Sequence, residues 1–264
     1  MIIIGEKINA TLSAVKSIIL NRETEKLISL AKEQAAAGAD FIDVNVGTGV
    51  GSLEDEIKSI QWAIENIQEQ VDTPICIDSA DPKVMVAGLE TLDNKTAMIN
   101  SAKAEKSNLE KVLPLAAEHD SFLIALAMDE DGIPKTVEGR LKCCGTILNA
   151  CEKHGVSIEN VYIDPLVMPV STDINSGMVT LKTLAAIKEQ FPGTRTVTGL
   201  SNVSYGLPER HRVNIAFLLM CLSAGLDAAI VDPLDEELMA AVKTGEALVG
   251  KDRHCRRYMR AFRN

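Results

Sequence analysis

Short aliphatic runs alternate with longer amphipathic stretches along the whole chain. The runs are rich in Ile, Val, Leu and Ala, and their length is typical of strands that are buried on both faces. Between them, apolar residues recur at the spacing of one face of a helix. This alternation predicts strands over Met1–Ile4, Asp40–Val46, Pro74–Ile77, Thr96–Ile99, Phe122–Ala127, Val161–Ile163, Thr194–Thr198 and Leu226–Val231.

Each predicted strand is followed by a predicted helix. Several of these helices end at a glycine, such as Gly38, Gly155 and Gly225, which is a common C-terminal signal. The helices are expected over Glu23–Ala37, Leu53–Gln70, Lys83–Glu90, Leu109–His119, Val137–His154, Met178–Gln190, Arg210–Ala224 and Glu236–Val249. Eight strand–helix units in 264 residues predict one domain over residues 1–264, an α/β (β/α)8 TIM barrel. A doubly wound open sheet is the alternative, weakened because no GxGxxG follows the first strand.

The predicted strands end in uncharged amides, hydroxyls or carboxylates. In a parallel barrel these ends meet at one mouth, where barrel enzymes carry out their chemistry. The β-branched strand Thr194–Thr198 runs into Gly199–Ser204 (GLSNVS), whose small residues offer a hydroxyl and an amide. The other strand ends contribute Glu6, Asn9, Asp43, Asn45, Asp78, Asn100, Asp164 and Asp232.

Some of these acidic residues have simpler explanations. A lone Asp after a strand is often a helix N-cap, but Asp81 is placed to cap the helix after Asp78, which leaves Asp78 without that role. Asp164 and Asp232 each precede a proline and are consistent with ordinary turns. The whole set of carboxylates and carboxamides suits a flat, nitrogen-rich heterocycle that presents N–H donors beside a carbonyl, and a pterin is such a group.

Composition narrows the class of protein. The net charge of −10 argues against a nucleic-acid surface, and no apolar run reaches the length of a membrane span. The N-terminus lacks the basic region of a signal peptide, so a cytoplasmic protein is expected. The six cysteines form no CxxC pair, so no metal site is predicted. None of the four histidines directly follows a predicted strand, and we expect none at the mouth.

The end of the chain differs from the rest. It holds six basic residues between Lys251 and Arg263 against the single acid Asp252. Cys255, Tyr258, Met259 and Phe262 recur at helical spacing. This pattern predicts a basic C-terminal helix at about residues 252–262, packed on the body with a solvated outer face.

Seven short motifs, in this order and spacing, resemble a known family. They are IIIGEKIN (Ile2–Asn9), DVNVG (Asp43–Gly47), CIDS (Cys76–Ser79), AMINS (Ala97–Ser101), YIDPL (Tyr162–Leu166), GLSNVS (Gly199–Ser204) and GLDAAI (Gly225–Ile230). The chain looks like the methyltetrahydrofolate:corrinoid/iron–sulfur protein methyltransferases, which are part of the wider group of pterin-binding barrels. The resemblance covers essentially the whole chain.

The resemblance implies the role of particular residues. Asp78, Asn100 and Asp164 would hold the pterin ring, with Glu6 and Asn9 nearby. Other positions of the family's site correspond to Gly199 and Ser201 on the face of the ring, Asn202 at the nitrogen that carries the methyl group, Arg210 near the folate, and Tyr205 facing the corrinoid. The stretch Tyr205–Pro208 departs from the family, which is more polar there.

The implied activity is methyl transfer between N5 of (methyl)tetrahydrofolate and the cobalt of a corrinoid bound to a separate protein. Asn202 would strengthen its hydrogen bond as charge develops on N5. A homodimer is expected from the family. Two alternatives remain: a dihydropteroate synthase-like pterin enzyme, for which only Arg210 and Arg212 offer positive charge near the mouth, and a catalytically silent subunit that binds folate or docks the corrinoid protein.

Overall fold

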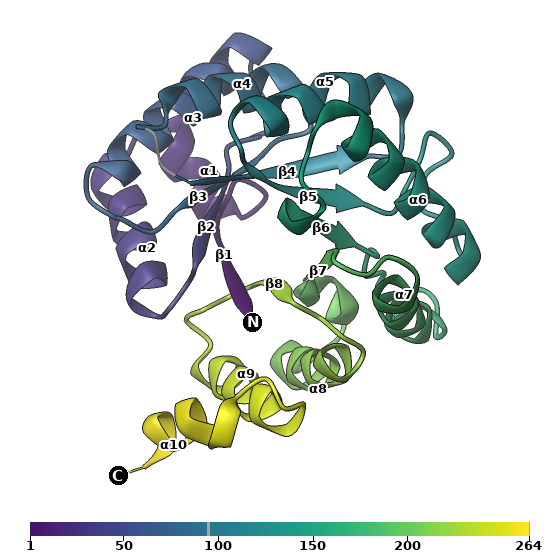
Figure 1. The fold of residues 1–264 in the computed structure, drawn as a ribbon. Coiled ribbons are helices and arrows are strands. Elements are labelled where there is room, and N and C mark those ends of the chain that lie inside the picture. The colour runs from purple at the N-terminus through teal and green to yellow at the C-terminus, as the bar shows by residue number, and fades with distance from the viewer. Residues whose placement is uncertain (94–95, 264) are drawn as a thin grey trace.

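The computed structural model describes residues 1–93 and 96–263. Eight parallel strands form a closed barrel in chain order, surrounded by the helices (Figure 1). This confirms the (β/α)8 prediction. The strands are β1 (Ile2–Asn9), β2 (Phe41–Asn45), β3 (Ile75–Asp78), β4 (Ala97–Lys103), β5 (Phe122–Leu126), β6 (Val161–Asp164), β7 (Arg195–Gly199) and β8 (Ala228–Val231).

The outer helices follow the predicted order, with one addition. That helix, α1 (Ser13–Leu20), buries Val15, Ile18 and Ile19 at helical spacing, but its N-cap residue makes no side-chain cap that would have marked its start. The remaining helices of the ring are α2 (Thr24–Ala36), α3 (Leu53–Gln68), α4 (Pro82–Thr91), α5 (Lys106–Glu118), α6 (Val137–His154), α7 (Ser176–Gln190), α8 (Arg210–Ser223) and α9 (Glu236–Leu248).

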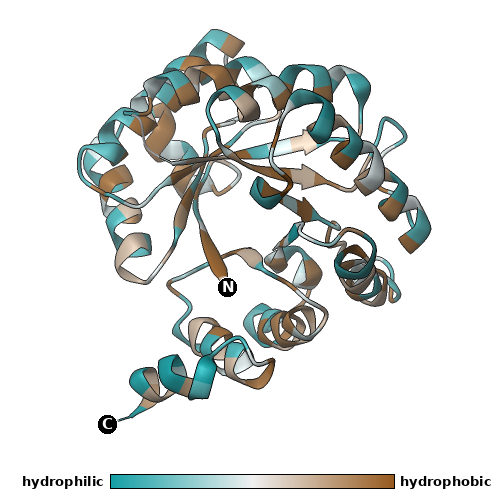
Figure 2. Ribbon diagram, viewed as in Figure 1, coloured by the Kyte–Doolittle hydropathy of each residue, from teal (hydrophilic) through white to brown (hydrophobic). Residues whose placement is uncertain are grey.

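The barrel interior is built in layers. One buried cluster takes a single residue from each strand: Ile4, Phe41, Cys76, Met98, Ile124, Tyr162, Val197 and Ala228. Apolar residues also line the inward sides of the helices, whereas their outer sides are polar (Figure 2). Because side chains alternate along a strand, the residue two positions further on also faces the interior, closer to the carboxyl end. On six strands that next residue is Glu6, Asp43, Asp78, Asn100, Asp164 or Gly199, so an apolar plug supports a polar layer.

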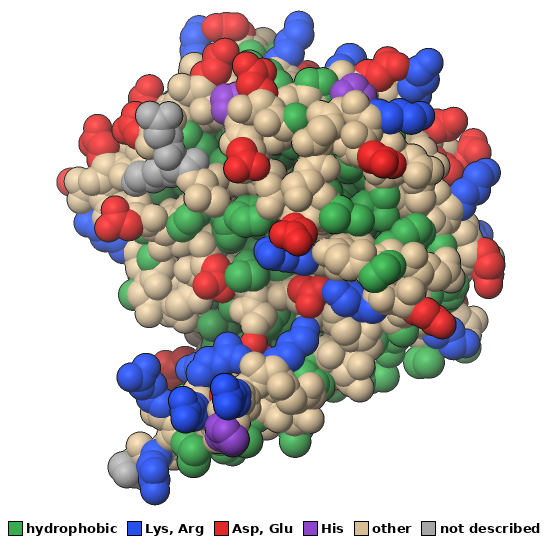
Figure 3. Space-filling view, viewed as in Figure 1, with side chains coloured by type: hydrophobic (Ala, Val, Ile, Leu, Met, Phe, Trp, Pro, Cys, Tyr) green, Lys and Arg blue, Asp and Glu red, His purple; other side chains and the backbone are tan. Residues whose placement is uncertain are grey.

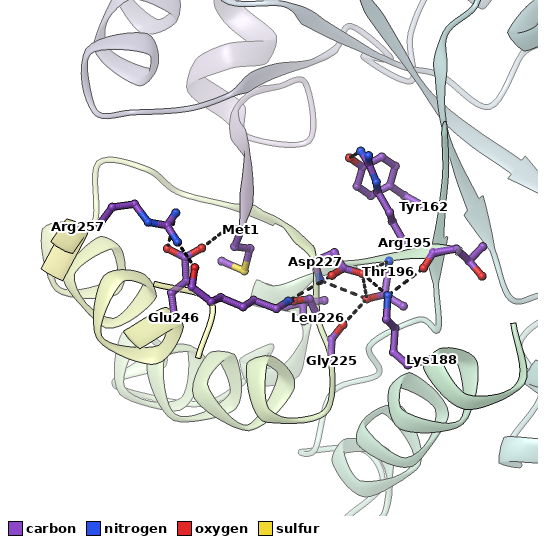
Figure 4. A network of polar contacts seen from close by, with 12 residues as sticks. Met1, Tyr162, Lys188, Arg195, Thr196, Gly225, Leu226, Asp227, Glu246 and Arg257 are labelled. Atoms are coloured by element: carbon purple, nitrogen blue, oxygen red, sulfur yellow. Dashed lines mark hydrogen bonds and ion pairs between the residues drawn. The ribbon is translucent and has the colours of Figure 1, made fainter. Parts of the chain in front are cut away.

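A polar network closes the opposite, amino-terminal end of the barrel (Figure 4). The Asp227 carboxylate accepts hydrogen bonds from Lys188 at 2.8 Å, Lys251 at 3.2 Å and the Thr196 amide at 3.0 Å. Burial alone would raise the pKa of Asp227, but the Lys188 hydrogen bond and the two lysine charges lower it overall. The network therefore joins α7, β7 and the segment after α9 far from the polar layer.

The C-terminal segment lies outside the ring of helices, beyond α9 (Figure 1). The helix predicted at about 252–262 is a 3-10 turn (Arg253–Cys255) followed by α10 (Arg256–Phe262), because His254 and Cys255 have positive φ angles that interrupt it. Its apolar side chains are not buried against the body: Met259 is 44% exposed and Phe262 45%. Basic side chains gather over this segment in the space-filling view (Figure 3).

Across residues 1–93 and 96–263, no helix has both the length and the apolar character that a membrane crossing requires.

Candidate functional site

A cavity of about 510 Å³ opens at the carboxyl ends of the strands. It brings together eight of the ten predicted site residues: Glu6, Asn9, Asp78, Asn100, Gly199, Ser201, Asn202 and Arg210. Asp164 and Tyr205 do not line it. The other lining residues are Lys7, Thr11, Leu12, Asp43, His211, Asn214, Ile230, Asp232 and Asp235.

Three residues of the polar layer, Asp43, Asp78 and Asn100, lie together at the cavity, and Asn45 at the end of β2 contacts this group. Asn45 Nδ2 donates to Asp78 Oδ2 at 2.9 Å, and Asn100 Nδ2 donates to Asp43 Oδ1 at 3.2 Å. Burial, and for Asp43 also the neighbouring charge of Asp78, raises the pKa of both Asp43 and Asp78. Two such carboxyl groups side by side hold a proton readily, which a ligand with N–H donors can displace by hydrogen bonding to them.

The prediction that Asp81, and not Asp78, caps the helix after β3 is confirmed. Asp81 is the N-cap of α4, and its carboxylate accepts a hydrogen bond from the Lys83 amide at 2.9 Å. Ser79, between them, donates to Glu56 of α3 at 3.0 Å. Capping of α4 therefore does not use Asp78, whose side chain turns into the cavity.

The GLSNVS stretch leaves β7 as a short 3-10 helix, Leu200–Ser204. Leu200 and Val203 are buried in the core, which fixes the turn from below. On its other side, Arg210 at the start of α8 donates hydrogen bonds to the Ser201 carbonyl at 2.7 Å and to Ser204 Oγ at 3.0 Å. Arg210 lines the cavity as predicted, and its guanidinium also holds this turn in place.

Asn202 is exposed at the cavity wall, and Gly199 makes room for it. A Cβ atom placed on Gly199 would lie 3.2 Å from Asn202 Nδ2, closer than most real Cβ contacts. The carboxamide of Asn202 thus lies back over the end of β7. No hydrogen bond to the Asn202 side chain is present among the described residues, so its amide is available to a ligand.

The side chains of Glu6 and Ser201 lie next to each other at the cavity. Ser201 Oγ donates to Glu6 Oε2 at 3.1 Å. Burial is the main cause that raises the pKa of Glu6 to about 7, and the charge of Asp232 adds to it. Nearby, Lys7 Nζ lies 2.9 Å from Asp232 Oδ2. Burial thus makes this carboxyl group of the cavity hold its proton more readily than an exposed glutamate does.

Asp164 faces the barrel interior at the end of β6 but its carboxylate is already occupied. Its Oδ1 accepts a hydrogen bond from the Leu166 amide at 2.7 Å, which is the turn expected of an Asp before a proline. The Gly199 amide bonds the same carboxylate, and burial raises its pKa to about 6. Asp232 forms a similar turn, with Oδ1 accepting from the Leu234 amide at 3.0 Å, yet it also lines the cavity.

Tyr205 lies at the C-terminal end of the 3-10 helix, outside the cavity, and is 67% exposed. Its carbonyl accepts a hydrogen bond from Ser171 Oγ at 2.7 Å, which ties the rim to the loop after β6. The phenol therefore projects from the rim of the mouth into solvent.

The sequence missed the residues that the starts of α8 and α9 contribute to the wall, and one expectation was wrong. His211 and Asn214 come from the first turns of α8, and Asp235 from the turn before α9. We expected no histidine at the mouth because none follows a strand, but a helix that starts at the mouth also contributes its first turns. The helical spacing from Arg210 to Asn214 was the available signal. Asn214 Oδ1 is buried and lacks a hydrogen-bond partner among the described residues, so the wall has spare capacity to accept a hydrogen bond.

Comparison with known proteins shows the family to which the chain belongs. A family model described as "Pterin binding enzyme" matches residues 5–232. The chain is 37% identical over 265 residues to the methylcorrinoid:tetrahydrofolate methyltransferase of Eubacterium limosum. The aligned region covers 100% of this chain and 96% of that protein. It is also 31% identical over 244 residues to methionine synthase of Mycobacterium tuberculosis, covering 88% of this chain and 20% of that protein.

Among solved structures, dihydropteroate synthase from Stenotrophomonas maltophilia superimposes with a TM-score of 0.73 at 22% identity, over 94% of this chain and 92% of that one. At that identity the likeness concerns the fold. The extent of the family match and the full-length identity show that the chain belongs to the pterin-binding enzymes. Within that family, the Eubacterium limosum protein, to which the chain is similar along its whole length, is a methyltransferase.

Proposed function

We propose that this protein transfers a methyl group between a corrinoid held by a separate carrier protein and N5 of tetrahydrofolate. The observation that carries the proposal is the 37% identity, along the whole chain, with a methylcorrinoid:tetrahydrofolate methyltransferase. The mouth of the barrel is lined by carboxylates and carboxamides of the kind proposed to hold a pterin. By that relative's name, the direction in the cell is toward folate.

The polar layer provides the means to hold a pterin. Carboxylates of Asp78 and Asp43 accept hydrogen bonds from N–H groups, and the Asn100 carboxamide both donates and accepts. Gly199 and Ser201 lie across the cavity, where they would face the ring, and Asn9 lies at its edge. Asp164 belongs to the same layer but does not line the cavity, and it would act through Gly199, whose amide donates a hydrogen bond to its carboxylate.

Asn202 is the residue proposed to act at N5. Its side-chain amide is free to bond the nitrogen whose charge changes during the reaction, and an orienting hydrogen bond that strengthens in the transition state lowers the barrier. A corrinoid, when bound by its carrier, supplies the cobalt–carbon bond chemistry. The barrel positions the folate and exposes N5 at the mouth.

The assay for this function uses the purified protein, tetrahydrofolate and a methylated corrinoid protein, and follows formation of 5-methyltetrahydrofolate. Turnover far above the protein-free rate supports the proposal. Folate binding without turnover would instead identify a silent binding subunit. We expect no dihydropteroate formation from a pterin diphosphate, because the cations of the cavity are engaged, Lys7 with Asp232 and Arg210 with the turn at Ser201.

Tyr205 is proposed to contact the corrinoid or its carrier, because its exposed phenol stands at the rim through which the carrier would approach. Tyr205→Ala should raise the KM for the methylated corrinoid protein by about 5-fold to 30-fold, the cost of losing about 1–2 kcal/mol of aromatic contact. The dissociation constant for tetrahydrofolate should stay the same. An unchanged KM would remove Tyr205 from the contact.

A homodimer is proposed through a groove between α7 and α8. The groove has a volume of about 430 Å³ and apolar walls, and Ile174, Met178 and Met220 beside it are 87%, 50% and 48% exposed. Exposed apolar surface of this kind is typical of protein interfaces, and twofold pairing would bury it on both copies.

Met220→Glu should therefore shift the protein from dimer to monomer in light scattering after size exclusion. Met259→Glu is the matched control, since Met259 is 44% exposed on α10, away from the groove, and should leave the dimer intact. A Met220→Glu protein that stays dimeric would place the interface elsewhere.

We also propose a cytoplasmic location, because all six cysteines are free thiols, five of them buried, as is usual in a reducing compartment. Fractionation of the producing cells tests it.

A further inference from the structure

The carboxamide of Asn202 cannot give up or take up a proton, yet the proposed reaction needs one moved. When N5 of tetrahydrofolate takes the methyl group, it must lose its own N–H proton. In the reverse reaction the N5–methyl bond breaks, its electron pair stays on N5, and N5 must gain a proton. Some group at the cavity has to exchange that proton with N5 in both directions.

We propose that Glu6 and Ser201 form the proton-transfer pair of this site. Ser201 is adjacent to Asn202 in the chain and lines the same cavity, and its Oγ lies 3.1 Å from Glu6 Oε2. The inference rests on the proposed function and adds to it the route of the proton.

The step balances without any further reactant. Toward folate, the N5–H proton passes to Ser201 Oγ as the Ser201 hydroxyl proton passes to the Glu6 carboxylate, and the neutral carboxyl group then releases it to water. In reverse, the Glu6 carboxyl group gives its proton to Ser201 Oγ, and the hydroxyl proton moves to N5. The single contact between Glu6 and Ser201 serves both directions, because a hydroxyl group both donates and accepts.

The surroundings fix the geometry of this pair. The carbonyl of Ser201 accepts hydrogen bonds from Arg210 at 2.7 Å and from Ser204 Oγ at 3.1 Å, so the serine backbone is held on two sides. Glu6 extends from β1, which pairs with β2 on either side of it, at Gly5 and at Ile8, and with β8 up to Gly5. Both residues of the pair thus lie on elements that are anchored in the core. Such anchoring keeps the two side chains at a constant distance, which proton transfer between them requires.

The electrostatics suit a reversible reaction. Burial raises the pKa of Glu6 to about 7, which lets the carboxyl group serve as base and acid at neutral pH. The charged or titratable groups around Glu6 are those of the cavity and its neighbours: Lys7, Asp43, Asp78, Arg210, His211, Asp232 and Asp235. Of these, Lys7 pairs with Asp232, and Arg210 bonds Ser201.

The signs of the pH dependence follow from these roles. Toward folate, Glu6 must be ionised, so kcat/KM should rise with pH and level off above about pH 7. In the demethylation direction Glu6 must carry its proton, so kcat/KM should fall above about pH 7.

The test is the pair of pH profiles for wild type, Glu6→Gln and Ser201→Ala. Glu6→Gln keeps the size of the side chain but cannot exchange a proton. It should lose the step near pH 7, and its plateau rate should fall about 10-fold to 10²-fold. This loss is at or below the lower end of the range for general acid–base catalysis, because water also reaches the cavity. The double variant Glu6→Gln with Ser201→Ala should be only slightly slower than Glu6→Gln alone, because both changes interrupt the same route. Ser201→Thr keeps a hydroxyl group and should retain most of the rate that Ser201→Ala loses.

A second measurement does not depend on turnover. Carbon-13 NMR of labelled glutamate carboxyl groups should show one that titrates near pH 7 in the wild type and is missing in Glu6→Gln. Glu236→Gln, which changes an exposed acid at the start of α9 outside the cavity, is the matched control and should leave both readouts unchanged.

The outcomes separate the two ideas. Wild-type protein that binds folate but transfers no methyl group overturns the proposed function. Wild-type protein that transfers methyl groups, with a Glu6→Gln variant that binds folate and keeps the same pH step, overturns only the proton-transfer pair.

Discussion

Replacing Asn202 with alanine is expected to slow methyl transfer about 10²-fold to 10³-fold while weakening tetrahydrofolate binding only modestly. The reason is that this carboxamide is proposed to bond N5 most strongly when charge develops there, and loss of one such preorganised hydrogen bond costs that factor in rate. In the proposed binding mode, most of the binding energy would come from the polar layer around Asp78, and Asn202→Ala leaves the contact between Asn45 and Asp78 in that layer intact.

Single-turnover kinetics with saturating folate separate the chemical step from binding, and calorimetry gives the dissociation constant. Asn175→Ala is a suitable control, because Asn175 precedes α7 without a side-chain cap and does not line the cavity. A rate loss below 10²-fold, or a loss seen entirely in the dissociation constant, would mean that Asn202 acts as a binding residue.

The order of elements was predictable because a barrel of parallel strands gives a strong signal at each step: a short aliphatic run, then an amphipathic helix. All eight strands appear where expected, although β1 and β4 extend further into the polar residues, to Asn9 and Lys103. Those extensions carry no hydrophobic signal. The register of both strands shifts in these extensions, between Gly5 and Ile8 in β1 and between Asn100 and Ala102 in β4.

The site was predictable only where residues follow a strand. Strand ends gave Glu6, Asp78 and Asn100 directly, because the fold brings these ends together. Residues from the helices depend on how α8 and α9 begin at the mouth, so His211 and Asp235 were missed. Asp164 shows the opposite case. It stands at a strand end, but its carboxylate is satisfied by backbone amides, and a sequence alone does not reveal which carboxylates are already paired.

Replacing Asp78 with alanine is expected to weaken tetrahydrofolate binding at least about 10²-fold. A carboxylate that accepts two hydrogen bonds from a ligand contributes about 1.5–3 kcal/mol through each of them, and alanine supplies neither. The free protein should not lose stability in proportion. Asp78 lies beside Asp43 in a buried layer where burial raises the pKa of both, so removing one of the two acids relieves part of the cost of burying them together.

Asp81→Ala provides the matched control three residues along the same loop. It removes the cap of α4 and should lower the free energy of unfolding by about 1 kcal/mol while leaving folate affinity unchanged. Calorimetric titration and thermal unfolding of both variants therefore give opposite patterns: affinity lost with stability kept for Asp78→Ala, and stability lost with affinity kept for Asp81→Ala. Such a pattern is the mark of a group retained for binding at the expense of stability. If Asp78→Ala bound tetrahydrofolate as tightly as the wild type, the polar layer would not be the pterin site, and the ligand of this cavity would have to be sought on its α8 side.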